Sequence, residues 1–188
     1  MPTEWSVLAR DIEGCHACVE LAASRHRVVV GDPAPEVPAG LVFVGEAPGA
    51  QEDVAGKPFV GKAGLLLDQL LAGAGMARAE VSVLNVVKCR PPRNRRPLSD
   101  EVVRCRPYLE RQLALLRPRL VVALGLTAVA WFLGRRVTLA AARGIVHEVG
   151  GYRVIATYHP SAAIQFGPTG APMAALRNDL AFAAQVLA

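Results

Sequence analysis

Four cysteines are the residues of this sequence whose types and spacing most directly suggest chemistry. Cys15 and Cys18 form a C-x-x-C pair, and Cys89 and Cys105 follow much later in the chain. Four soft thiolates suit zinc or an iron–sulfur cluster, and spacing alone does not separate the two. Two disulfides are disfavoured in the reducing cytoplasm that we expect, and buried thiols without metal are the remaining alternative.

A run rich in cations and prolines, residues 88–97, surrounds one of these cysteines. Three prolines within the run exclude a regular helix face and predict a loop. Such a loop could be merely solvated, or it could bind the phosphates of a polyanion and release their counterions. A metal centre would then brace the basic loop. The run begins at Lys88, and the side chains that we expect to contact such phosphates are Arg90, Arg93, Arg95 and Arg96.

A second group of candidates consists of polar residues that follow buried segments. Glu46 lies in a turn, residues 45–49, that could offer backbone N–H groups to an electron-rich ligand. The amide of Asn85 could match the Watson–Crick edge of a base, and Phe59 could stack on a flat ligand. His159 precedes a proline that stiffens its backbone. Each residue also has a purely structural alternative. Glu46 could cap a nearby N–H group, Asn85 could satisfy buried backbone groups, and the rings of Phe59 and His159 could simply pack in the core. No Walker or dinucleotide-binding motif is present.

The elements that must position these residues are predicted from hydrophobic patterning. Short apolar runs predict strands that are covered on both faces, and apolar residues at helical spacing predict helices between these strands. Alternating strands and helices predict a three-layer α/β/α single domain over residues 1–188, with a central four-stranded parallel sheet. Ligands bind beyond the carboxyl ends of such strands, where the polar candidates gather. The predicted strands are 41–45, 81–87, 120–125 and 153–158, and the predicted helices are 63–74, 100–116, 127–133 and 173–187.

Bulk properties limit the class of protein. The 188 residues are 52% apolar, which allows one ordinary core and indicates no disorder. No stretch approaches the roughly 18 apolar residues of a membrane span, and the first residues lack the pattern of a secretion signal. We therefore expect a soluble, cytoplasmic monomer that binds no membrane. The net charge of +5 favours a polyanionic partner.

The candidate residues lie in three sequence motifs that follow one another along the chain. The motifs are GEAPGAQED with GKPFVGKAG within residues 45–64, NVVKCRPPRNRRP at residues 85–97, and HPSA at residues 159–162. With them, the sequence resembles the family 4 uracil-DNA glycosylases over nearly its whole length. The resemblance implies a DNA repair enzyme that hydrolyses the N-glycosidic bond of deoxyuridine. It would release uracil from single- and double-stranded DNA and leave an abasic site for base excision repair. The four cysteines fall where the family places the ligands of a structural 4Fe-4S cluster.

The same resemblance implies a role for each candidate around a flipped-out uracil. Phe59 would stack on the base, and Asn85 would accept from N3–H and donate to O4. His159 would donate to O2 as negative charge develops there. Glu46 would serve in water attack and in stabilising the cationic sugar. The pocket would be completed by the backbone of Glu46, Ala47 and Pro48 and by Glu52, which would crowd C5 and exclude the methyl group of thymine.

The sequence departs from the family pattern after the HP dipeptide. Many relatives continue into a Leu-Arg pair, whereas this chain reads SAAIQFG at residues 161–167. Ile164 or Phe166 could still wedge into the DNA, but the missing arginine removes a phosphate contact.

Three alternatives remain at this point. Some superfamily members trap the sugar covalently through a histidine in an inserted basic loop, and no histidine lies between Cys89 and Cys105. A non-catalytic iron–sulfur DNA-binding module would not need Glu46, Asn85 and His159 together. A nucleotide-binding protein in which the four cysteines hold a structural zinc ion would differ in its metal.

Overall fold

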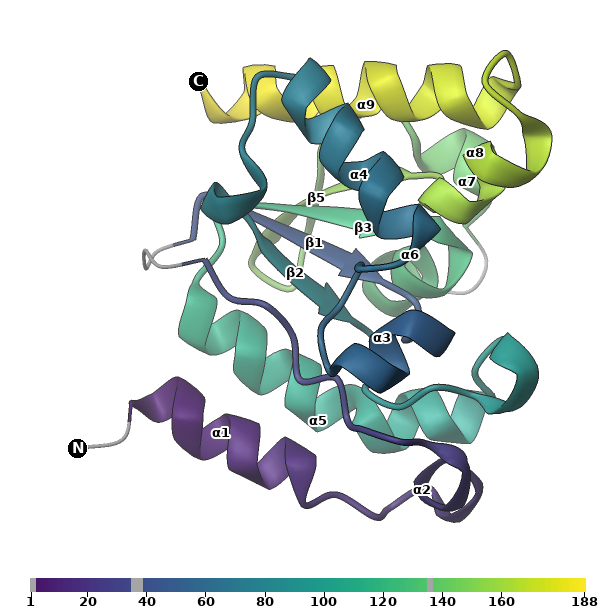
Figure 1. Cartoon of the computed structure of the whole chain (residues 1–188). Helices are drawn as coiled ribbons and strands as arrows, with labels where there is room; N and C mark the ends of the chain where they lie inside the picture. The colour runs from purple at the N-terminus through teal and green to yellow at the C-terminus, as the bar shows by residue number, and fades with distance from the viewer. Residues whose placement is uncertain (1–2, 35–38, 135–136) are drawn as a thin grey trace.

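The fold is a central β-sheet between two helical layers (Figure 1). The structure is a computed structural model that describes residues 3–34, 39–134 and 137–188. The strands within these ranges are β1 (Leu41–Gly45), β2 (Ser82–Asn85), β3 (Leu120–Leu124), β4 (His147–Val149) and β5 (Tyr152–Thr157). The helices are α1 (Glu4–Glu13), α2 (Val19–Ser24), α3 (Ala50–Ala55), α4 (Lys62–Gly73), α5 (Ser99–Leu116), α6 (Gly125–Leu133), α7 (Leu139–Ala142), α8 (Pro160–Phe166) and α9 (Ala171–Leu187), with 3₁₀ turns at Arg78–Glu80 and Pro92–Asn94.

The predicted sheet is confirmed in type, and its strand number needs one correction. The strand order is β2-β1-β3-β5-β4, and the four predicted strands pair in parallel. The fifth strand, β4, pairs antiparallel with β5 at the edge. It was missed because it has three residues and its middle residue, Glu148, is exposed, so it carries no apolar run.

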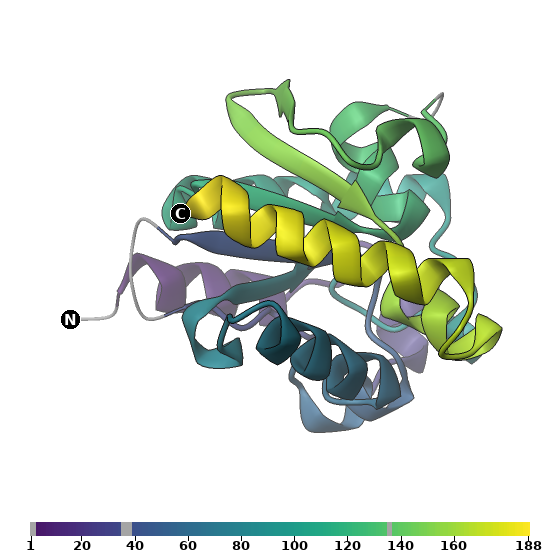
Figure 2. The same ribbon diagram turned by 90° about the horizontal axis from the view of Figure 1, so that it is seen from above.

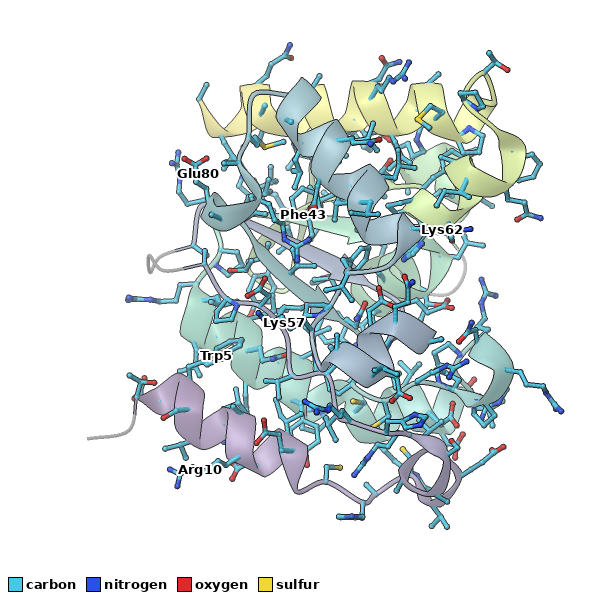
Figure 3. The ribbon with its side chains drawn as sticks, in the orientation of Figure 1. Trp5, Arg10, Phe43, Lys57, Lys62 and Glu80 are labelled. Atoms are coloured by element: carbon cyan, nitrogen blue, oxygen red, sulfur yellow. The ribbon has the colours of Figure 1, made fainter. Side chains whose placement is uncertain are left out.

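Strand side chains alternate between two separate halves of the core. On one face, Val42 and Val44 of β1 belong to the apolar cluster that includes α5 and α6. On the other face, Leu41 and Phe43 belong to the cluster that includes α4 and α9. Figure 2 shows α9 crossing the sheet, and Figure 3 labels Phe43 between β1 and α4. Burial on both faces explains why the strands are continuously apolar.

The longer helices were predicted well, and the short ones were not. α4, α5, α6 and α9 overlap the predicted ranges, and α5 begins one residue earlier than predicted, at Ser99. Helices α2, α3, α7 and α8 span only four to seven residues, too few for helical periodicity to stand out. The ten-residue α1 was also missed; it buries only Leu8 and Ile12.

The carboxyl ends of β1, β2, β3 and β5 meet at one edge of the sheet, as predicted. The start of α1 and the C-terminus lie at the opposite end (Figure 1). Within the described ranges, none of the helices has both the length and the apolar character that crossing a bilayer requires.

Candidate active site

A cavity of about 500 Å³ opens at the carboxyl edge of the sheet. This volume lies in the range of small-molecule sites in proteins. It is formed where the turn after β1, the loop before α4, the β3–α6 junction and the start of α8 come together. Six of the seven residues predicted to contact uracil line it: Glu46, Ala47, Pro48, Glu52, Phe59 and His159.

The seventh residue, Asn85, does not line the cavity; it lies beside Gly45 and the ring of Phe59, which does line it. Asn85 and Gly45 are paired in the parallel register of β1 and β2. A Cβ on Gly45 would lie 2.6 Å from Asn85 Oδ1 and 2.7 Å from Phe59 Cζ, so no larger residue fits between the amide and the ring. Asn85 is buried and its Oδ1 accepts no hydrogen bond from the described residues. A buried amide oxygen without a partner is costly, which indicates a ligand donor at this point.

Phe59 is held in a backbone conformation that few bulky residues adopt. Its φ is 53°, in the left-handed region. The two residues after Phe59 are held by the Glu52 carboxylate, which accepts the backbone N–H groups of Val60 and Gly61 at 3.0 and 2.7 Å. Gly64 of α4 contacts the Phe59 backbone so closely that a Cβ would overlap it. This strain is maintained by its surroundings, as is typical of functional sites.

Glu52 therefore supports the site as well as lining it. Besides the two N–H groups after Phe59, its carboxylate accepts the N–H of Gly49 at 3.1 Å. One side chain thus joins the turn after β1 to the loop that carries Phe59.

His159 is oriented by its own helix. It is the N-cap of α8, and its Nδ1 accepts the backbone N–H of Ser161 at 3.2 Å. Because Nδ1 is an acceptor, the ring proton of the neutral imidazole resides on Nε2. Burial lowers the pKa of His159 to about 4, and the nearby Glu52 carboxylate opposes this only in part. The ring centroids of His159 and Phe59 are 5.5 Å apart, so a neutral N–H donor lies beside the aromatic wall.

Glu46 has a partner that the sequence reasoning missed. The hydroxyl of Thr127, in the first turn of α6, donates to Glu46 Oε2. Arg96 Nε lies 3.7 Å from the same oxygen. Leu124, Gly125 and Leu126 of the β3–α6 junction also line the cavity. The rule about carboxyl ends of strands could have found this junction, because the third predicted strand ends there.

An ion pair connects the basic loop to α5. Arg95 donates to both carboxylate oxygens of Glu101 at 2.9 and 2.7 Å, and also to Glu20 at 3.0 Å. These contacts lower the pKa of Glu101, chiefly through the hydrogen bonds from Arg95. Arg95 and Arg96 line the cavity, whereas Arg90 donates to Asn94 Oδ1.

Of the remaining cations in residues 88–97, one points outward and one inward. Arg93 is exposed in a 3₁₀ turn, with a φ of 54°. Lys88, with which the run begins, is 1% exposed, so it is part of the interior and not of a phosphate-binding surface.

The two predicted wedge residues lie on α8 beside the cavity. Ile164 is 45% exposed and lines a neighbouring groove together with Gln51 and Lys62. Phe166, at the end of α8, is 65% exposed. Both are therefore accessible to a large partner at this face.

All four cysteines line a second, small cavity between α1, α2 and α5. Within the described residues, no three His, Cys, Asp or Glu side chains are arranged to ligate a single metal ion. Arg25, Lys88 and Arg104 line the same cavity, and Arg25 donates to Cys89 Sγ at 3.1 Å.

The charges around this second cavity fit an anionic group. Burial raises the pKa of Cys18 and Cys89, and that of Cys105 to about 11. Burial also lowers the pKa of Lys88 to about 8. Buried thiolates require positive charge nearby, and the three cations of the cavity provide it. The donor set and its surroundings therefore fit a thiolate-ligated cluster.

Comparison with known proteins agrees with this geometry. The family model described as the uracil DNA glycosylase superfamily matches residues 34–181. The chain belongs to this superfamily. It is 43% identical to a type-4 uracil-DNA glycosylase of Thermotoga maritima, with 82% of this chain and 80% of the relative covered. It is 41% identical to the type-4 enzyme of Archaeoglobus fulgidus, over 84% and 81% of the two chains. A type-4 enzyme of Pyrobaculum aerophilum is 43% identical, over 82% and 81%.

Membership of the superfamily agrees with the site as built from its residues. The matched segment contains the whole lining of the large cavity, together with Asn85, Cys89 and Cys105. The other two cysteines, Cys15 and Cys18, precede it. In this superfamily member, the large cavity and half of the cysteine set thus lie on one continuous stretch of chain.

Proposed function

We propose that this protein is a uracil-DNA glycosylase that hydrolyses the N-glycosidic bond of deoxyuridine in DNA, releasing uracil and leaving an abasic site for base excision repair. The observation that carries the proposal is the meeting of Phe59 and His159 at one cavity, with the unpartnered Oδ1 of Asn85 beside Gly45 and the Phe59 ring. The 43% identity to a type-4 uracil-DNA glycosylase supports the same reaction.

The base enters the cavity as a flipped-out nucleotide, since chemistry on a base requires removing it from the stack. Phe59 supplies the flat surface on which it stacks. The unpartnered Oδ1 of Asn85 accepts N3–H of uracil, and the amide N–H₂ donates to O4. Cytosine presents the opposite pattern, an acceptor at N3 and a donor at position 4. A fixed amide therefore favours uracil.

Bond cleavage places negative charge on the departing uracil. His159 donates Nε2–H to uracil O2, and this hydrogen bond strengthens as the charge develops. The imidazole is neutral at physiological pH because burial lowers its pKa to about 4. It therefore acts as a fixed N–H donor and not as a cation.

Glu46 faces the cationic sugar that the same step creates. Its carboxylate stabilises the oxocarbenium-like centre and orients the attacking water. Thr127 holds this carboxylate through its hydroxyl group and so acts as a positioning residue. Arg96 lies nearby but is 63% exposed, so its interaction with Glu46 is screened by solvent.

Replacing Thr127 with valine is expected to lower kcat for uracil release roughly 10-fold, because Glu46 loses a hydrogen bond to its charged form. The isosteric change keeps the volume of the side chain. Single-turnover kinetics on a uracil-containing duplex measure the effect, and Thr127→Ser should restore most of the rate. An unchanged rate in Thr127→Val would remove the threonine from this role.

The rest of the pocket sets its shape. The backbone of Ala47 and Pro48 forms the floor, and Glu52 forms the wall near C5 of the base. Three backbone N–H groups hold the Glu52 carboxylate in place, which favours steric exclusion of a methyl group over a merely flexible contact.

DNA lies across the face that contains the cavity. Arg90, Arg93 and Arg96 contact phosphates, while Arg95 serves mainly to shape the loop through Glu101. Ile164 and Phe166 on α8 wedge into the space left by the extruded nucleotide. We expect the protein to act as a monomer on both single- and double-stranded DNA.

We also propose that Cys15, Cys18, Cys89 and Cys105 hold a 4Fe-4S cluster. When bound, the cluster supplies a four-point structural link between the N-terminal segment and the basic loop, and it takes no part in bond cleavage. A cubane cluster offers separate iron corners to four thiolates, which suits cysteines that surround a cavity. A single zinc ion would need all four sulfurs about 2.3 Å from one point.

The test of both proposals uses the purified full-length protein. Incubation with an oligonucleotide containing one uracil should yield free uracil and an alkali-labile abasic site, and matched thymine and cytosine oligonucleotides should react far more slowly. The uracil should be tested opposite each base and in single strands. Iron and acid-labile sulfide should both be present in the same protein. An intact uracil oligonucleotide after reaction with iron-loaded protein would reject the enzymatic proposal.

A further inference from the structure

Lys88 is a buried lysine located between the two sites described above. It is 1% exposed, and its Nζ donates to the backbone carbonyl of Asn85 at 2.6 Å. The side chain thus folds back over three residues to the base-reading position. Nothing in the phosphate-binding or catalytic roles assigned above uses this contact.

The other surroundings of Lys88 belong to the cysteine cavity. Its side chain lines that cavity, and its backbone N–H lies 3.4 Å from Cys105 Sγ. The next residue along the chain is Cys89. Among the ion pairs of the described residues none includes Lys88, so no carboxylate balances its charge there. A buried ammonium group requires a counter-charge, and the cysteine sulfurs are the acidic groups beside it.

We propose that Lys88 is a positioning residue that couples the cluster to uracil recognition: its ammonium group balances the charge of the thiolate-ligated cluster while holding the Asn85 carbonyl in place. The inference rests on the proposed function, because it assumes a cluster at the four cysteines and base reading by Asn85. It goes further by making the cluster a determinant of base selection, beyond its role as a structural link.

Backbone hydrogen bonds connect the segment between the two sites to neighbouring parts of the chain. Val86 N–H donates to Gly45 O at 2.9 Å, and Val87 N–H donates to Glu46 O at 3.0 Å. Lys88 O accepts the N–H of Val29 at 2.8 Å. A displacement at Lys88 would therefore reach both Asn85 and the turn that carries Glu46.

The experiment compares Lys88→Met with Lys57→Met, the same substitution at an exposed lysine labelled in Figure 3. Two quantities are measured on protein with equal iron content: the midpoint reduction potential of the cluster, and the ratio of excision rates on uracil and cytosine oligonucleotides. Loss of the cation should shift the potential in the negative direction, because it disfavours the more negative reduced cluster. Loss of the Asn85 contact should lower the uracil-to-cytosine ratio roughly 10-fold. Lys57→Met should match the wild type in both.

A second variant separates charge from position. Arg25 donates to Cys89 Sγ at 3.1 Å and to Cys15 O at 2.6 Å, and these contacts do not include Asn85. Arg25→Met should therefore shift the potential without changing the uracil-to-cytosine ratio. If Lys88→Met does not fold, Lys88→Arg keeps the charge but displaces the donor, so the potential should stay and the ratio should fall.

The result that overturns the inference is a Lys88 variant whose uracil-to-cytosine ratio equals that of Lys57→Met. A potential shift without a change in the ratio would equally reject the coupling, and a changed ratio without the potential shift in Lys88→Met would reject the counter-charge. Failure of the proposed function appears elsewhere, as wild-type protein that lacks iron or does not excise uracil.

Discussion

Replacing His159 with alanine is expected to lower the rate of uracil release by about 10²–10³-fold, because the variant lacks the N–H donor that we propose for the developing charge on uracil O2. The effect should appear in kcat under single-turnover conditions, with a smaller change in DNA affinity. His147→Ala is the matched control, since this imidazole lies on the edge strand β4 and contacts Ala142 O. The control should retain the wild-type rate.

The pH dependence distinguishes a neutral imidazole from a cationic one. The pKa of His159 in the folded protein is lowered to about 4 from its ordinary 6.5. The neutral donor is therefore present across pH 6 to 9, and the ratio of wild-type to His159→Ala rates should be constant there. A ratio that falls as pH rises through about 6.5 would indicate an imidazolium and contradict the assignment.

The same shift predicts a stability effect. Above pH 6.5 His159 is neutral in both the folded and the unfolded states. As pH falls from 6.5 toward 4, the unfolded state binds a proton that the folded state excludes, so the stability contributed by this group decreases.

Replacing Asn85 with aspartate is expected to reduce discrimination between uracil and cytosine by about 10- to 100-fold, the range for a paired amide–base contact. The new carboxylate cannot donate to uracil O4, whereas it can accept from the amino group of cytosine. Uracil excision should slow, and cytosine excision should become faster. Both rates are obtained from oligonucleotides that differ only in the target base.

The control for this substitution is Asn178→Asp, the same change at an exposed position of α9. It introduces an equal negative charge far from the base-reading position, so it should leave the discrimination ratio unchanged. Equal ratios for the wild type and Asn85→Asp would remove Asn85 from base recognition. Melting curves should accompany the assay, since the Asn85 side chain is buried.

Much of the fold followed from local patterns. Apolar runs such as residues 41–45 and 120–125 predicted β1 and β3, because strands covered on both faces leave no polar alternation. The edge strand β4 was not predictable in this way, since its short and partly exposed run carries no such pattern.

The set of candidate residues came from the sequence, and their geometry did not. The chemistry of Glu46, Asn85 and His159 and their place after strands indicated one edge of the sheet. The role of Lys88 could not be predicted, because a lysine in a basic run is ordinarily solvated. Its burial depends on packing among segments distant in the chain. Thr127 was missed for a similar reason, since its contact with Glu46 joins two different strand ends.

The sequence by itself determined the strand-and-helix alternation, the chemical groups available and the family, because these depend on residue types and their spacing along the chain. Only the tertiary structure decided which groups meet: the proton on His159 Nε2, the unpartnered oxygen of Asn85 and the inward ammonium of Lys88. Burial and hydrogen-bond partners arise from contacts between segments far apart in the chain, and no local pattern specifies them.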